Sequence, residues 1–276
     1  MSRAESPAEI ILTRTRVGAG SFAAVYTTRY GRVAYKEVHT AANTTQLKSE
    51  YKLLARLHRT CNGTSFFSLP RAFAYCEPQS DAGALFISES TGNTGPPAHF
   101  PAATAEGPSL CRLYLGKIFD RTGQTARPRF FSTANFPLDE ARYEALRGAV
   151  SDLPTLSEVA QGMGAMLALL HFRGLVDARD VEFVLGGDGY GDHTFYVIDF
   201  NQVRPFDPAS GSVEPLVDAF FSNDPYYPRP RHGNPLYTEF KDAYLTACPD
   251  ETRELAQAFI QTIEQKQAER DIQRDM

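Results

Sequence analysis

The pattern of apolar residues changes along the chain, and this change limits the possible folds more than any other feature. Up to about residue 120, short apolar runs are β-branched or alternate with polar residues, which is typical of strands. From about residue 138, the spacing is mainly helical. The predicted strands are 10–17, 24–30, 32–39, 72–76, 84–88 and 111–120. The sequence therefore predicts an α+β fold with a sheet-rich part, residues 1–120, and a helical part, residues 121–276.

One helix is predicted within the sheet-rich part and several in the helical part. Residues 46–58 place Leu47, Tyr51, Leu54 and Leu57 on one face, and Asn43 or Thr44 can cap this helix. Segment 91–109 is rich in Pro, Gly, Ala and Thr and is expected to be a long loop. The later helices are predicted at 139–150, 156–172 and 251–276, and a hairpin with strands 183–185 and 194–200 around a turn at 186–191 lies between them.

Composition and charge exclude several classes of protein. The formal net charge is −5, which argues against a nucleic-acid binder with a broad basic surface. The longest apolar run, 163–170, is far shorter than the roughly 20 residues of a membrane-spanning helix, and the first residues lack the apolar core of a signal peptide. The four cysteines lie far apart with no Cys-x-x-Cys, which argues against a zinc module or a disulfide framework. We expect a cytoplasmic protein with no nucleic-acid or membrane partner.

Gly18 and Gly20 lie between the first two predicted strands. Glycines there allow backbone N–H groups to approach a phosphate closely, although a plain turn would also carry them. A dinucleotide-binding fingerprint, with Glu37 as its ribose-binding acid, would need a helix directly after the glycines. Residues 24–30 instead have strand alternation, so the sequence favours a hairpin that covers a phosphate.

Lys36 and Glu50 extend this phosphate-binding pattern. Lys36 lies on the next predicted strand, and Glu50 follows 14 residues later on the predicted helix. A strand lysine can supply a positive charge to the α- and β-phosphates, and a helical acid can hold that lysine in place. Alone, each would be an ordinary solvated side chain. Together, in this order, Gly18, Gly20, Lys36 and Glu50 resemble the nucleotide-binding residues of a known superfamily, and this resemblance implies an ATP site.

These motifs resemble those of the protein-kinase-like superfamily. Its Gly-x-Gly-x-x-Gly-x-Val loop is matched by residues 18–25, with Ala23 in place of the third glycine, and its Val-Ala-x-Lys strand by residues 33–36. Ile198-Asp199-Phe200-Asn201 resembles Asp-Phe-Gly, with asparagine for glycine. The resemblance implies a bilobal fold with a β-rich N-lobe and a mostly helical C-lobe. It also implies that Asp199 binds Mg²⁺ or Mn²⁺ bridging the ATP phosphates, whereas a turn-capping carboxylate is the ordinary alternative.

The loop before the predicted hairpin departs from the family's His-Arg-Asp-x-x-x-x-Asn. In one alignment Asp180, 19 residues before Asp199, is the catalytic acid, and we prefer this one. In the other, Asp177 takes that role. Both put Glu182 in place of the metal-binding asparagine, where an added negative charge predicts strong dependence on Mg²⁺ or Mn²⁺. An acid-rich loop paired with Arg179 is the alternative without function.

The chain also lacks the long segment with which protein kinases dock a peptide. Only 19 residues separate Asp199 from Asp218, and no Ala-Pro-Glu occurs. The resemblance then implies an ATP- and Mg²⁺-dependent phosphotransferase acting on a small molecule. Residues 177–186, 198–202 and 223–227 further resemble an uncharacterised fungal family of kinase-like proteins, which implies no activity. The alternatives are a pseudokinase that binds nucleotide or a protein partner, and ATP-independent acid–base chemistry by the loop carboxylates.

Overall fold

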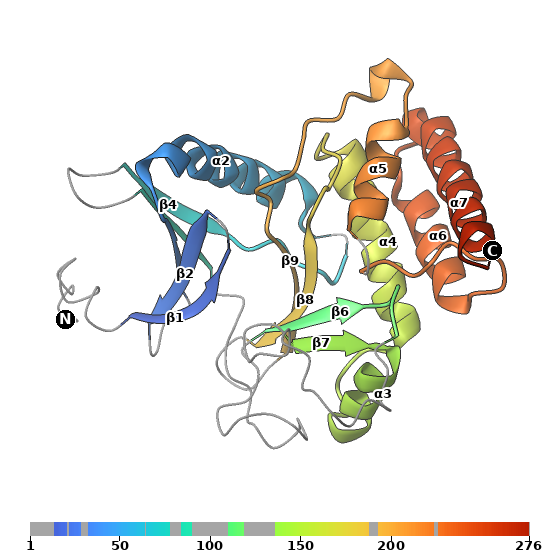
Figure 1. Ribbon diagram of the computed structural model, residues 1–276, viewed down its shortest axis with the longest axis horizontal. Helices are drawn as coiled ribbons and strands as arrows, with labels where there is room; N and C mark the ends of the chain where they lie inside the picture. The colour runs from blue at the N-terminus through green and yellow to red at the C-terminus, as the bar shows by residue number, and fades with distance from the viewer. Residues whose placement is uncertain are drawn as a thin grey trace.

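The computed structural model describes residues 14–20, 22–28, 33–63, 65–77, 84–89, 110–118, 136–187, 193–223 and 226–275. Within them the chain is a mixed α+β protein in which two sheets lie beside a group of helices (Figure 1). The predicted α+β class is confirmed. The predicted loop at 91–109 lies outside the described residues, as does most of the turn at 186–191.

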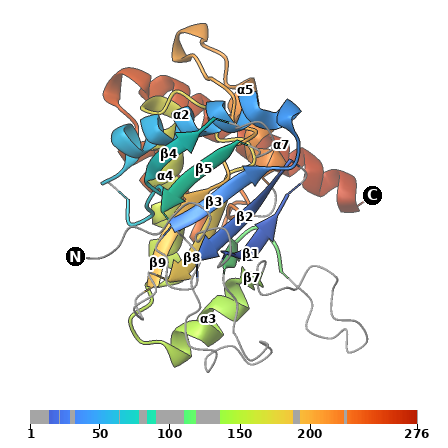
Figure 2. The same ribbon diagram turned by 90° about the vertical axis from the view of Figure 1, so that its left-hand side faces the viewer.

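The first sheet is antiparallel and has the order β1-β2-β3-β5-β4 (Figure 2). All five strands were predicted, with ends that differ by a few residues where they are described. Its hairpin of β1 and β2 carries the glycines, and the neighbouring β3 carries Lys36. The strands are β1 Arg14–Ala19, β2 Ala23–Thr28, β3 Val33–Val38, β4 Ala72–Cys76 and β5 Leu85–Glu89.

Helix α2, Thr44–Cys61, packs against the first sheet at β4 and β5. It is longer at both ends than the predicted 46–58. Asn43 is its N-cap residue, but the side chain makes no capping hydrogen bond and instead donates to the Phe22 carbonyl. The face turned to the core buries Leu47, Leu54 and Leu57 together with one acid, Glu50. The amphipathic spacing therefore places a carboxylate inside the protein.

The second sheet has the order β7-β6-β8-β9. Its hairpin, β8 Glu182–Gly187 and β9 His193–Ile198, is antiparallel as predicted. Strand β6, Cys111–Tyr114, is shorter than the predicted 111–120 and pairs with β8, so it joins this sheet although the predicted division of the chain fell at residue 120. Strand β7, Phe136–Asp139, was not predicted and runs parallel to β6.

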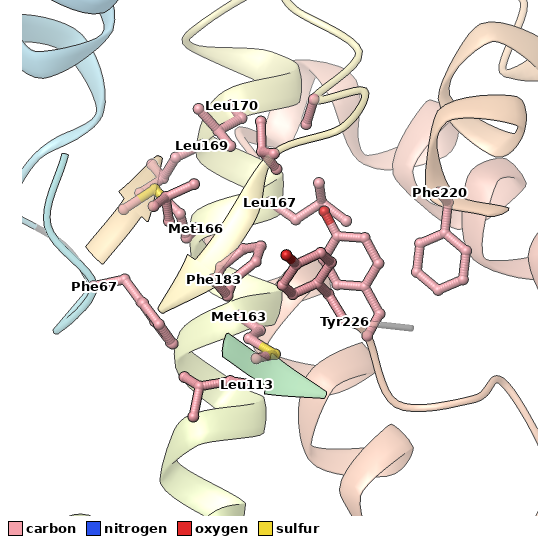
Figure 3. Packing of buried hydrophobic residues seen from close by; sticks show 14 of the residues in the cluster. Phe67, Leu113, Met163, Met166, Leu167, Leu169, Leu170, Phe183, Phe220 and Tyr226 are labelled. Carbon is pink, nitrogen blue, oxygen red and sulfur yellow. The ribbon is translucent and has the colours of Figure 1, made fainter. Parts of the chain in front are cut away.

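Helix α4, Leu156–Phe172, is the centre of the helical part. A capping box of Thr155 and Glu158 starts it, and most of its residues are buried. Figure 3 shows its leucines and methionines packing with Leu113 of β6 and Phe183 of β8. The other helices are α3 Glu140–Ala149, α5 Glu214–Ser222, α6 Pro235–Ala247 and α7 Arg253–Asp275, with 3₁₀ turns at Ala41–Asn43, Pro208–Ser210 and Asp250–Thr252.

Helices α4 and α6 approach each other closely at Gly164. A Cβ atom at this position would lie 2.1 Å from the backbone oxygen of Phe240, so only glycine fits there without moving a helix. None of the helices in the described part of the chain is both long enough and apolar enough to cross a membrane.

Candidate functional site

Three of the predicted site residues meet where the first sheet faces the helical part. Lys36 Nζ on β3 lies 2.7 Å from Glu50 Oε1 on α2 and 3.3 Å from Asp199 Oδ1. Asp199 is the residue that directly follows β9. Asp199 is 163 residues from Lys36 in the chain. The fold therefore assembles one lysine and two carboxylates from three separate elements. We call this group the Lys36 cluster.

The Lys36 cluster is largely shielded from water. Its side chains are 17% exposed for Lys36, 5% for Glu50 and 32% for Asp199. Burial alone would lower the pKa of Lys36, but the charges of Glu50 and Asp199 outweigh it, so the pKa is raised above its ordinary value. Lys36 is therefore held as a cation. One oxygen of Glu50, Oε2, makes no hydrogen bond within the described residues.

The glycine hairpin lies beside this cluster. The Lys36 ammonium stands 4.9 Å from the ring centre of Phe22, and the Gly20 N–H donates to the Ala23 carbonyl at 2.9 Å to close the turn. Neither Gly18 nor Gly20 has a positive φ, and a Cβ atom at either would meet its nearest neighbour only at 3.9 Å. Packing therefore does not require glycine at these two positions, which leaves room for a ligand to approach the backbone.

The backbone is strained at both acids that face this region. Asp199 has φ 63° and Asp180 has φ 60°, in the left-handed region that non-glycine residues seldom adopt, and Ala178 has φ 54°. Such conformations persist only where the surroundings enforce them, and they concentrate at functional sites. Three of the four non-glycine residues with positive φ in the described chain therefore lie in the acidic loop or directly after β9, and the fourth, Leu175, lies just before that loop.

Asp180 is half-buried and held by two side chains. Its backbone N–H donates to Asn223 Oδ1, and its carboxylate accepts from Gln202 Nε2. Asn223 also donates to the Ala178 carbonyl at 2.8 Å, so it fixes both ends of this short loop. Burial and the charge of Asp199 raise the pKa of Asp180, which makes it a better proton acceptor than an ordinary aspartate.

Asp177 is placed differently, because its carboxylate is fully buried. Oδ1 accepts from the backbone N–H groups of Arg179 at 3.0 Å and Arg204 at 2.9 Å, and Oδ2 accepts from Arg204 Nε at 2.6 Å. The ion pair expected with Arg179 is therefore formed with Arg204. With its oxygens engaged and no exposed surface, Asp177 cannot reach a substrate in this conformation.

Glu182 begins β8, opposite Ile198, the residue before Asp199, and it too has an arginine partner. Its Oε2 lies 2.7 Å from Arg112 Nη2 and 2.9 Å from Arg112 Nε. The pKa of Glu182 is raised, mainly by burial. The positive charge of Arg112 works against this rise, and the negative charge of Asp199 contributes to it. The negative charge expected from Glu182 is thus balanced by Arg112.

The described residues contain no group of three or more His, Cys, Asp or Glu side chains that could hold a metal ion. Asp199 and Glu182 therefore do not form an all-protein metal site there. Magnesium often binds through only one or two carboxylates, with water and substrate phosphates completing its shell. The oxygen donors at hand fit a metal that arrives with a phosphate, but not a metal held by the protein alone.

Four further residues shape this site and were not predicted: Arg112, Gln202, Arg204 and Asn223. They act by fixing the acids of the loop and of β8. Gln202 and Asn223 belong to runs noted for their family resemblance, which was the only signal available. Nothing in the local sequence marks Arg112 or Arg204 as the partner of a particular acid.

Comparison with known families corrects the resemblance drawn from the motifs. A family model described as DUF3669, zinc finger protein, matches residues 195–256, less than a quarter of the chain. No kinase family model matches, so the assignment to the protein-kinase-like superfamily and to its fungal branch is wrong. The quoted motifs are short and lack the third glycine of the loop, the glycine of Asp-Phe-Gly (Asn201 here) and the catalytic-loop asparagine. No curated protein matches the chain.

The zinc finger description has no counterpart among the residues that the family model matches. Residues 195–256 contain one histidine, His232, and one cysteine, Cys248. A structural zinc site takes four Cys or His ligands, so this segment cannot supply a set by itself. The match therefore relates one segment of the chain, including Asp199, to that family and does not define a site.

Proposed function

We propose that this protein binds a nucleoside triphosphate together with Mg²⁺ and transfers the terminal phosphoryl group to a small molecule. The observation that carries the proposal is the Lys36 cluster, in which a protonated lysine lies between two carboxylates from separate elements. A cation for the phosphates and an oxygen ligand for the metal are what phosphoryl transfer needs side by side, because its catalysis is mainly positioning and charge stabilisation.

Each residue of the cluster then has a distinct role. Lys36 binds the phosphates and Glu50 orients it. Asp199 would hold the Mg²⁺, which supplies charge neutralisation when it is bound with the nucleotide. Gly18 and Gly20 let a phosphate approach the backbone of the hairpin closely, and the lack of any packing reason for glycine at either position supports this role.

Asp180 is the acid assigned to the acceptor. Its carboxylate is partly accessible, and it lies close enough to Asp199 for the negative charge of Asp199 to help raise its pKa. It would orient the acceptor hydroxyl and take up its proton. Asp177 and Glu182 are instead assigned to positioning, since both are engaged by arginines. The nucleotide would lie between a sheet-rich lobe and a helical lobe, in keeping with the bilobal arrangement expected from the sequence.

The ion pairs of Asp177 with Arg204 and of Glu182 with Arg112 favour a second function. With Asp177 and Glu182 engaged, only Asp180 is left in the loop for chemistry, and the chain could bind nucleotide without transferring phosphate or serve as a partner-binding module. ATP-independent acid–base catalysis by all three carboxylates is disfavoured, because two of them are already paired.

Calorimetric titration of the full chain with ATP, with and without Mg²⁺, tests the proposal. Binding should be much tighter with Mg²⁺ than without it and should weaken about tenfold or more in Lys36→Ala and Asp199→Ala. Lys48→Ala is the matched control, because Lys48 lies on α2 with its ion pair at the surface. Absence of binding by the folded chain, or equal weakening in the control, would refute the nucleotide site.

Asp180→Asn then separates the two functions. If the chain is a phosphotransferase, this variant should bind the Mg²⁺ complex of ATP like the wild type but lose phosphate transfer in a screen of small hydroxyl compounds. If the wild type binds MgATP and neither hydrolyses nor transfers phosphate, the binding module is the correct assignment.

A further inference from the structure

An open groove with a volume of about 1020 Å³ lies between α4, α6 and the start of β9. None of the predicted site residues lines it. Its volume is at the upper end of the roughly 300–1,000 Å³ of small-molecule pockets, which suits a longer ligand. It runs beside the close contact of α4 with α6 at Gly164, so two rigid helices form its walls.

One aromatic side chain in this groove is exposed and yet firmly held. Phe66 is 40% exposed, and it is the one residue among the exposed large hydrophobics of the described chain that lines the groove. Its ring stacks on Phe67 with centroids 4.8 Å apart and meets Phe195 edge-on at 5.1 Å. It also covers Gly162, where a Cβ atom would lie 2.4 Å from the ring. A rigid exposed aromatic ring in a groove is typical of a protein-binding anchor.

The groove is also acidic. Asp152, Glu158, Glu239 and Asp242 line it, against Arg173 and His193. Within the described residues no ion pair with lysine or arginine involves any of these four carboxylates. Glu239 accepts a hydrogen bond at 2.6 Å from Gln161, a neutral side chain. This charge attracts lysine and arginine and repels the phosphates of nucleic acids and anionic lipids.

We propose that this groove binds a short segment of a partner protein in which an apolar side chain stands between lysines or arginines. The apolar side chain packs on Phe66, and the basic side chains pair with Glu239 and Asp242 on α6. The partner is distinct from the nucleotide and from the acceptor of the proposed reaction. The interaction therefore does not depend on whether phosphate transfer occurs.

Selection of a displayed library of random 12-residue peptides on the full chain tests this inference. Enriched peptides should carry an apolar residue flanked by lysine or arginine. Their affinities, measured by fluorescence anisotropy, should fall about tenfold or more in Phe66→Ala and in Glu239→Lys/Asp242→Lys. The control Glu251→Lys/Glu254→Lys makes the same change in charge at exposed acids outside the groove and should leave affinity unchanged.

Several results would overturn the inference. They are no enrichment, enrichment of acidic or uncharged peptides, equal loss of affinity in the control, and retained affinity in Phe66→Ala. Self-association that disappears in Phe66→Ala would assign the groove to a second copy of the chain instead. Circular dichroism checks that each variant is folded. ATP titration of the groove variants should match the wild type, which separates this test from that of the nucleotide site.

Discussion

Substitution of Asp177 tests directly how the acidic loop is built. Its buried carboxylate accepts hydrogen bonds from two backbone N–H groups, of Arg179 and Arg204, and from the Arg204 side chain. Asp177→Ala removes all three. Asp177→Asn keeps an oxygen for the backbone N–H groups but loses the charge. We therefore expect the alanine variant to be clearly less stable than the asparagine variant.

The expected magnitudes follow from these contacts. A hydrogen bond to a charged group contributes about 1.5–3 kcal/mol, so losing the two from the backbone should lower the free energy of unfolding by about 3–6 kcal/mol. The Arg204 side chain is 52% exposed, and water replaces much of its interaction with Asp177. Neutral hydrogen bonds remain in Asp177→Asn, so its loss should be about 1–2 kcal/mol.

Urea unfolding followed by circular dichroism measures both values, because the chain contains no tryptophan for fluorescence. Asp250→Ala is the control. Asp250 is 93% exposed and its ion pair with Arg253 lies at the surface, so the loss should stay below about 1 kcal/mol. A loss of similar size in Asp177→Ala would refute the structural role. So would an Asp177→Asn variant that keeps full stability but loses phosphate transfer, since Asp177 would then be the catalytic acid.

Three other predictions concern packing and pH. Gly164→Ala should lower the free energy of unfolding by about 1–3 kcal/mol, because the added methyl group would clash with the Phe240 carbonyl oxygen. Gly148→Ala in α3, which meets nothing within 4 Å, should raise it by about 0.5–1 kcal/mol; equal effects on urea unfolding would contradict this. Burial lowers the pKa of His171 to about 3, so stability should fall as the pH drops from about 6.5 toward 3, where only the unfolded chain takes up the proton. His171→Phe should flatten that profile, and an unchanged slope would exclude His171 as its source. The raised pKa of Asp180 predicts that acidification reduces kcat/KM at a higher pH than an ordinary aspartate would, and a rate independent of pH through the acid range would contradict its role.

The elements predicted well from the sequence are those that their own residues determine. Helix α4 was predicted to the residue, because a long apolar run follows Thr155 and Glu158, which form its capping box. Strand β7 was missed because it has four residues, contains Pro137, and exists through parallel pairing with β6. Such pairing depends on contacts between distant segments and leaves no local periodicity.

The candidate site also contains residues that could be predicted from the sequence and residues that could not. Lys36 and Glu50 lie at definite places on a predicted strand and a predicted helix, and the resemblance implied that Asp199 joins them, although the family assignment itself is wrong. The arginine partners could not be predicted, since Arg204 is 27 residues from Asp177 and Arg112 is 70 residues from Glu182. Only the folded chain shows which acids these arginines neutralise.

These arginines change the electrostatic argument for the proposed site. From the sequence, we expected the negative charge of Glu182 to cause a strong dependence on Mg²⁺. In the structure, Arg112 balances the charge of Glu182, and Arg204 balances that of Asp177. Lys36 is shared between Glu50 and Asp199, and no described ion pair neutralises Asp180. The charges at Asp180 and Asp199 are therefore the ones that would repel a bare triphosphate. Asp180→Asn should accordingly bind metal-free ATP more tightly than the wild type does, because it removes one of the two charges that would repel the triphosphate, and unchanged binding of metal-free ATP in this variant would contradict the argument from charge.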